Sequence, residues 1–193
     1  MTQFALVVAA TEDLGIGLLS NLPWRIPKDM AFFKQVTTKI PSTTSTPNAV
    51  IMGRVTWESI PPKFRPLDNR FNIVVSRNPT YNLKQADTTQ PNTILVDSLD
   101  KAFHAIPPNT PRTFVIGGAQ MYKMAIQHAN CTHILLTRIR SKVECDTFFP
   151  DINGDHYRLA SHEELEAYVG DEVVRGVQKH KEYEYEFTLY LRK

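Results

Sequence analysis

The chain has 193 residues, a hydrophobic content of 42% and a formal net charge of +2, values typical of a soluble globular protein with one core and not of a general nucleic-acid binder. The apolar stretch at 4–10 is too short to span a membrane. Cys131 and Cys145 form neither a metal-ligand spacing nor a disulfide framework, so we expect no metal site and a reducing, cytoplasmic location.

Strand and helix patterns alternate along the chain. The apolar run at 4–10 predicts a strand buried on both faces, and Pro27 suits the first turn of a helix over 27–37. Further strands are expected at 49–52, 71–76, 93–96, 113–116 and 133–139, and further helices at 54–60, after Ser98, and from Ala119 to about His128. This alternation predicts right-handed crossovers and a mainly parallel sheet with helices on both faces.

The last segment has a different period. In 183–191 the odd positions are apolar and the even positions mostly polar, which predicts an antiparallel strand at the edge of the sheet. The sequence shows no linker, repeat or low-complexity stretch. We therefore predict an α/β fold in which residues 1–193 form a single domain, with a mixed, mainly parallel sheet and an antiparallel C-terminal edge strand.

Asp29 is the first candidate functional residue. It follows Pro27 by two positions, in a first helical turn where the helix dipole tolerates negative charge, so one interpretation is a surface residue that complements the dipole. Its neighbours include Trp24, Met30 and Phe33. A carboxylate among apolar side chains is costly unless a partner binds it or its pKa changes, which favours a functional role.

Three predicted strands end in residues that suit phosphate. Arg54 and Thr56 follow one strand, Ser76–Arg77 end another, and Gly117–Gly118 follow a third, where backbone amides can approach a pyrophosphate. Each signal alone is weak, because a glycine pair is usually a tight turn and an exposed arginine is usually solvated. Together they predict a dinucleotide with an extra phosphate, NADPH. The G-x-G-x-x-G fingerprint is absent, so an ordinary Rossmann site is not expected.

Ordered motifs over essentially the whole chain resemble the dihydrofolate reductase family, in a form similar to its eukaryotic, fungal branch. The motifs are LGIG…LPW (14–24), PKDMAFFK (27–34), VIMGRVTWESIP (50–61), RPLDNR (65–70), NIVVSR (72–77), FVIGGAQMY (114–122), LLTRI (135–139) and DTFFP (146–150). The resemblance implies NADPH-dependent reduction of 7,8-dihydrofolate to 5,6,7,8-tetrahydrofolate for one-carbon metabolism, with hydride transfer to C6 and protonation of N5. It also implies a monomer that antifolate inhibitors bind.

The resemblance further implies roles for single residues. Asp29, bonded to Thr137, would hold the pterin ring and promote protonation of N5 through water. Leu22 and Trp24 would belong to a mobile loop over the nicotinamide, and Arg70 would bind the substrate's glutamate carboxylate. The substrate walls are expected from Val7, Val8, Met30, Phe33, Ile60 and Leu67. The cofactor contacts are expected from Ala10, Ile16, Gly17, Leu22, Gly53, Arg54, Thr56, Ser76, Arg77, Ser98, Ile116, Gly117, Gly118, Ala119, Gln120, Met121, Tyr122 and Thr147.

Several positions depart from the family pattern. Val55 and Asp97 stand where relatives often place basic residues near the 2′-phosphate, which reduces the expected margin of NADPH over NADH. Asp29 is shorter than the glutamate usual in eukaryotic members. Met30 replaces a larger or branched wall residue, and its flexible thioether can repack around different ligands.

Two alternatives remain at the level of sequence. One is another reductase on the same fold, such as the pyrimidine reductase of riboflavin synthesis, which would share the cofactor edge without pairing Asp29 with Arg70. The other is a nucleotide-binding protein without catalytic activity, in which Asp29→Asn would change nothing.

Overall fold

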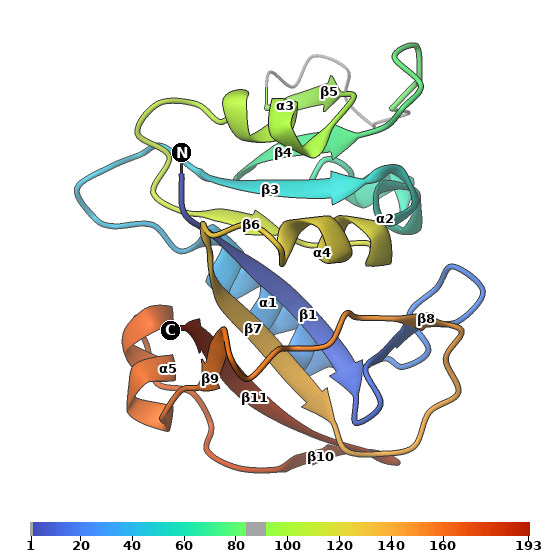
Figure 1. The fold of residues 1–193 in the computed structure, drawn as a ribbon, viewed down its shortest axis with the longest axis vertical. Coiled ribbons are helices and arrows are strands. Elements are labelled where there is room, and N and C mark those ends of the chain that lie inside the picture. Colours follow the sequence, from blue (N-terminus) through green and yellow to red (C-terminus); the bar gives the residue numbers. More distant parts are fainter. Residues whose placement is uncertain (1, 84–91) are drawn as a thin grey trace.

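The computed structural model describes residues 2–83 and 92–193 and contains one large sheet (Figure 1). Its strands are β1 (Phe4–Thr11), β3 (Asn48–Gly53), β4 (Arg70–Val75), β5 (Thr93–Val96), β6 (Thr113–Val115), β7 (Cys131–Ile139), β9 (Tyr157–Leu159), β10 (Gln178–His180) and β11 (Tyr183–Arg192). They follow the order β10-β11-β7-β1-β6-β3-β4-β5, with β9 also paired to β11. Each pair of neighbouring strands in the part of the sheet that runs from β7 to β5 is parallel, and β11 is antiparallel to β7.

Helices cover both faces of this sheet, as predicted. They are α1 (Pro27–Thr38), α2 (Arg54–Ser59), α3 (Leu99–His104), α4 (Ala119–Ala125) and α5 (His162–Val169), with a 3₁₀ turn at Pro62–Phe64. Alternate residues of a strand point to opposite faces, so β1 sends Leu6 into one apolar cluster with α3 and α4. It sends Val7 into a second cluster with α1, α2 and α5. The predicted mixed, mainly parallel α/β fold is confirmed.

The C-terminal strand β11 is antiparallel, as expected, but it is not the outermost strand. The short strands β9 and β10 pair with it on the side away from β7. Sequence patterns also missed a small second sheet of β2 (Gly15–Gly17) and β8 (Thr147–Phe148), because strands of two or three residues carry no measurable period. The helix α5 was missed too, although Ser161 and Glu164 form a capping box at its start.

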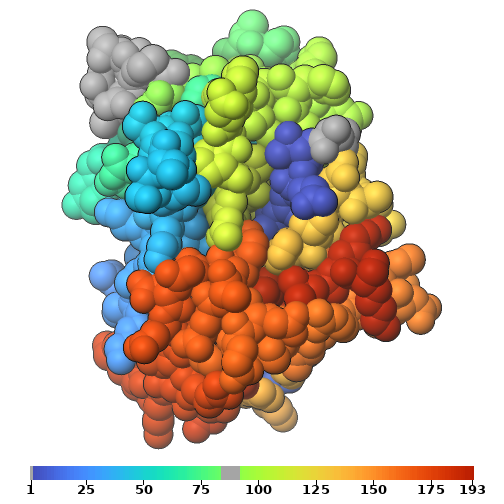
Figure 2. Space-filling view, turned by 90° about the vertical axis from the view of Figure 1, so that its left-hand side faces the viewer, coloured from blue at the N-terminus to red at the C-terminus, as the bar shows by residue number. Residues whose placement is uncertain are grey.

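The parallel strands direct their carboxyl ends toward α2 and β8, at the right of Figure 1. The two chain ends lie at the opposite end of the molecule, on the face that Figure 2 turns toward the viewer. Ligands of open α/β sheets bind at the carboxyl ends of the strands, so the chain termini are remote from the expected site. Among the described residues no helix is long and apolar enough to cross a membrane.

Candidate active site

Asp29 lies in the first turn of α1, which Pro27 begins. Its Oδ1 accepts a hydrogen bond of 2.6 Å from Thr137 Oγ1, a residue 108 positions away on β7. Thr137 faces α1 because Leu135 and Ile139, two positions to either side, belong to the cluster on that face. The carboxylate is therefore fixed between a helix and the sheet and does not extend into bulk solvent.

Burial raises the pKa of Asp29 from 3.8 to about 6, and the hydrogen bond from Thr137 opposes this rise. The residue remains partly exposed, so a ligand can reach its carboxylate. A carboxyl group whose pKa lies near neutrality can bind a cationic or hydrogen-bonding heterocycle and exchange protons around pH 7.

Most of the predicted substrate walls lie on the same face of the sheet as this carboxylate, the face that α1 covers. The walls that belong to or pack against that cluster are Val7, Phe33, Ile60 and Leu67. Met30 is 54% exposed, so its side chain borders solvent. Val8 differs, because its side chain packs into the cluster with α3 and α4. Only the main chain of Val8 is available to a site on the Asp29 side.

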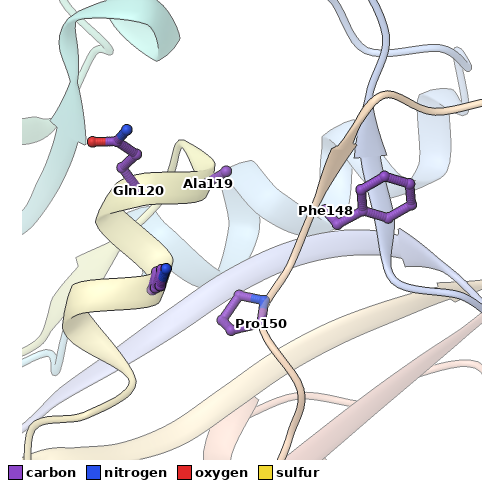
Figure 3. A pocket seen from close by; sticks show the side chains of 5 residues that line it. Ala119, Gln120, Phe148 and Pro150 are labelled. Carbon is purple, nitrogen blue, oxygen red and sulfur yellow. The ribbon is translucent and has the colours of Figure 1, made fainter.

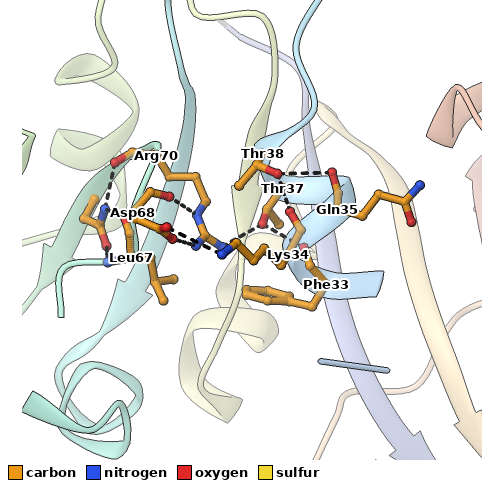
Figure 4. A network of polar contacts seen from close by, with 9 residues as sticks. Phe33, Lys34, Gln35, Thr37, Thr38, Leu67, Asp68 and Arg70 are labelled. Atoms are coloured by element: carbon orange, nitrogen blue, oxygen red, sulfur yellow. Dashed lines mark hydrogen bonds and ion pairs between the residues drawn. The ribbon is translucent and has the colours of Figure 1, made fainter. Parts of the chain in front are cut away.

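Arg70 is not a surface charge, because it is only 3% exposed. Its Nε donates to the main-chain oxygen of Asp68 at 2.8 Å, its Nη2 to Asp68 Oδ1 at 3.0 Å, and its Nη1 to Thr37 Oγ1 at 3.0 Å (Figure 4). Its Cζ lies 5.9 Å from the centre of the Phe33 ring. The guanidinium thus lies next to a predicted substrate wall and is held in a fixed orientation.

The glycine pair after β6 meets the end of β3. Gly53 N donates to Gly117 O at 2.8 Å, and the peptide bond between Gly117 and Gly118 is cis. A Cβ on Gly117, whose φ is +129°, would lie 3.0 Å from Thr56 Oγ1, and one on Gly118 would lie 3.4 Å from the same atom. The residues predicted after two separate strands therefore form one narrow cradle in which backbone can approach a ligand.

The remaining phosphate candidates lie along the neighbouring strand ends. Ser76 N donates to Val96 O at 2.9 Å, which places Ser76 and the exposed Arg77 beside the end of β5. Arg54 is exposed and pairs with Glu58 at 3.3 Å. Ser98 accepts a bond from Lys101 N and so caps α3.

The loop between β2 and α1 contains Leu22, which is 53% exposed, and Trp24, which is 4% exposed. Trp24 Nε1 is buried and has no hydrogen-bond partner within the described residues. Leu19 N donates to Asp146 Oδ2 at 3.0 Å, next to the pairing of β2 with β8. That pairing contains three cofactor candidates, Ile16, Gly17 and Thr147.

The first turns of α4 supply the next candidates. Ala119 and Gln120 border a cavity of about 240 Å³, which Figure 3 shows between α4 and the segment that carries Phe148 and Pro150. Tyr122 is buried and donates from its hydroxyl to Val7 O at 2.6 Å, which links a predicted cofactor residue to a predicted substrate wall. The other candidates of this region are Ala10 and Met121, in the cluster with α3 and α4, and Ile116, packed against the cluster with α1.

Sequence reasoning missed three charged residues that lie near Arg70 or the loop before α1. Asp68 binds Arg70, and Lys34 lies 3.5 Å from Asp68. Asp146 accepts a hydrogen bond from Leu19 N in the loop before α1. The spacing of Asp68 and Arg70 was visible in RPLDNR, but their contact depends on how the chain turns into β4.

Comparisons with known proteins identify the family. A family model described as "Dihydrofolate reductase" matches residues 3–192. The dihydrofolate reductase of Heliothis virescens is 40% identical over 89% of this chain and 90% of its own, and that of Candida albicans is 39% identical over 98% and 97%. The structure of Schistosoma mansoni dihydrofolate reductase superposes with a TM-score of 0.79 and 34% identity over 98% of each chain.

Fold, cradle and relatives together define a nicotinamide-dependent reductase. The full-length relatives and the family model distinguish it further from a pyrimidine reductase of the same fold. The chain belongs to the dihydrofolate reductase family, the enzymes that reduce dihydrofolate to tetrahydrofolate with NADPH.

Proposed function

We propose that Asp29 is the acid that binds the pterin ring in this enzyme and promotes protonation of N5. The observation that carries this proposal is the hydrogen bond of 2.6 Å from Thr137, which orients the carboxylate, together with a pKa of about 6 caused by burial. The carboxylate accepts hydrogen bonds from the substrate's amino group and ring nitrogen. The polarised ring and an ordered water then carry the proton toward N5.

The chain offers a suitable site for NADPH. Side chains at Gly117 or Gly118 would fill the cradle beside Thr56, so backbone amides are free to approach a pyrophosphate there. The exposed cations Arg54 and Arg77 suit the remaining phosphate. NADPH supplies the hydride when it is bound, and the protein's part is to hold both reactants and exclude water.

The other roles follow from position. Arg70, held by Asp68 and Thr37, would receive the carboxylate of the substrate's tail, because a guanidinium matches a carboxylate with two parallel bonds. Leu22, exposed on the loop before α1, would close over the nicotinamide. Trp24 would anchor this loop through its buried ring.

The test is a steady-state assay of NADPH oxidation with dihydrofolate. Asp29→Asn should lower kcat at pH 7 by about 10²-fold or more, the usual size of an acid–base contribution. The loss should become smaller at low pH, where the substrate is already protonated in solution. The matched control is Asp151→Asn at an exposed acid, which should retain full activity. Full turnover by Asp29→Asn at neutral pH would contradict the proposed role.

We further propose that residues 1–193 form a single catalytic domain that works as a cytoplasmic monomer. The large sheet supports the single domain, because it pairs β1 near the start of the chain with β7 and β11 near its end. Light scattering at enzyme concentrations used in assays should give a mass near 22.0 kDa. Twice that mass would contradict a monomer.

A further inference from the structure

One acidic residue, Asp68, accepts hydrogen bonds from Arg70, the arginine that the proposed function assigns to the substrate's tail. Asp68 accepts from Arg70 twice, through its main-chain oxygen at 2.8 Å and through Oδ1 at 3.0 Å (Figure 4). Its own side chain is 63% exposed, whereas that of Arg70 is 3% exposed. An exposed carboxylate therefore lies directly beside the buried guanidinium to which a ligand carboxylate would bind.

The N–H donors of Arg70 show how many hydrogen bonds remain for a ligand. A guanidinium has five N–H groups, and Asp68 and Thr37 accept from three of them. Within residues 2–83 and 92–193, one N–H on Nη1 and one on Nη2 have no partner. A bidentate carboxylate requires two N–H groups, which is the number that remains. A ligand can thus bind without displacing Asp68, but its negative charge then shares the guanidinium with that of Asp68.

Lys34 completes the charge distribution. Its Nζ lies 3.5 Å from Asp68 Oδ2, and its side chain is 60% exposed. Burial tends to raise the pKa of Asp68, but Lys34 and Arg70 together hold that pKa below its ordinary value. Asp68 is therefore ionised at neutral pH, and the three side chains carry one net positive charge instead of two.

We propose that Asp68 is a specificity-determining residue, which lowers the affinity of the enzyme for folates and antifolates with a carboxylate tail relative to ligands without one. The proposal rests on the proposed role of Arg70. Its physical basis is repulsion between the carboxylates of Asp68 and of the ligand, which share one guanidinium. Because Asp68 is exposed and hydrated, this repulsion is weakened but not removed. This specificity role differs from a structural role for Asp68. In a structural role, loss of the charge would release Arg70 and weaken binding of the tail.

The experiment compares two inhibitors of nearly equal size that differ in the charge of their tail. One is a 2,4-diaminopteridine with a benzoylglutamate tail, and the other has both tail carboxylates converted to amides. Dissociation constants are measured with NADPH present, for the unchanged enzyme and for Asp68→Asn. Asparagine keeps the main-chain oxygen and an amide oxygen at the place of Oδ1, so Arg70 retains both acceptors. The Kd of the carboxylate inhibitor should fall about three- to tenfold, and that of the diamide should stay within about twofold.

Salt gives a second readout. Because Asp68→Asn raises the net positive charge at the tail end, binding of the carboxylate inhibitor should depend more steeply on ionic strength than in the unchanged enzyme. A Kd that rises or stays constant for the carboxylate inhibitor overturns the proposal. So does an equal change for both inhibitors, which would indicate a general change of the groove.

Arg70→Leu separates this proposal from the proposed function. If that variant weakens the carboxylate inhibitor and spares the diamide, Arg70 binds the tail, and the result for Asp68→Asn decides the role of Asp68 alone. If Arg70→Leu affects both inhibitors equally, the assignment of Arg70 fails and the inference for Asp68 fails with it. Thermal unfolding of each variant confirms that the fold is retained.

Discussion

Thr137 Oγ1 donates to Asp29 Oδ1 at 2.6 Å and connects the central sheet to the first turn of α1. Burial raises the pKa of this carboxyl group, whereas the hydrogen bond lowers it. The hydroxyl therefore both fixes the orientation of the acid and limits how strongly it holds a proton.

Removal of that hydroxyl should change the pH dependence of the enzyme. In Thr137→Val the ionised form of Asp29 loses a hydrogen bond, so its pKa should rise from about 6 by about one further unit, since bonds to charged groups are worth about 1.5–3 kcal/mol. The acidic midpoint of kcat/KM in the free enzyme should move upward by the same amount. Thr137→Ser keeps the hydroxyl and should keep the midpoint. Identical profiles for both variants would exclude this coupling.

Asp29 should also reduce the stability of the folded protein at neutral pH. Its pKa is about 6 in the folded state against 3.8 as the reference value, so the unfolded chain binds fewer protons between these values and stability falls as pH rises through that window. The difference of about two pKa units corresponds to about 3 kcal/mol above pH 6. Asp29→Asn should therefore raise the free energy of unfolding by about 1–3 kcal/mol at pH 8 and leave it unchanged near pH 3. Urea titrations at both pH values measure this, and an equal effect at both would contradict it.

Gly117 should tolerate no side chain. Its φ of +129° is unfavourable for any other residue, and a Cβ there would lie 3.0 Å from Thr56 Oγ1. Gly117→Ala should lower the free energy of unfolding by about 1–3 kcal/mol and weaken the protection that NADPH gives against thermal unfolding. Gly154, where a Cβ meets nothing within 4 Å, provides the control. Gly154→Ala should leave both quantities within experimental error, and equal behaviour of the two variants would refute the cradle.

The sequence predicted the elements whose patterns are long and local. The strand at 4–10 and the helix begun by Pro27 appear as β1 and α1, because a continuous apolar run and a proline at a helix start each have one common structural outcome. The environment of Asp29 could be anticipated from its apolar neighbours, but Thr137 was identified only through the family resemblance. A lone β-branched residue on a strand carries no local signal for a partner 108 positions away.

The parts that could not be predicted depend on tertiary pairing. The pair β2–β8 joins two segments of two and three residues, too short for periodicity, and its register is set by the loops around it. The side chain of Val8 could not be assigned to a face from an all-apolar run, since both faces of such a strand are buried. Arg70 was identified only through the family resemblance, and only its contacts with Asp68 and Thr37 show why it is buried.

We expect the preference for NADPH over NADH to depend on how the charge of Asp97 is compensated. Asp97 follows β5 directly, and Val96 O of that strand accepts from Ser76 N at 2.9 Å, so Asp97 lies beside the strand end that carries the predicted phosphate residues. An isolated carboxylate there would repel the extra phosphate of NADPH. Lys101 Nζ lies 2.8 Å from Asp97 Oδ2 and compensates part of this charge.

Lys101→Met should therefore raise KM for NADPH by about three- to tenfold, since it leaves one uncompensated charge near a phosphate in a solvated position. KM for NADH should remain unchanged, because that dinucleotide lacks the extra phosphate of NADPH. Asp97→Asn should act in the opposite direction and lower KM for NADPH. Steady-state assays with both dinucleotides at low and high salt measure the ratio, and the effect should diminish as salt is added. If Lys101→Met raised KM equally for both dinucleotides, the charge balance at Asp97 would have no part in the choice of cofactor.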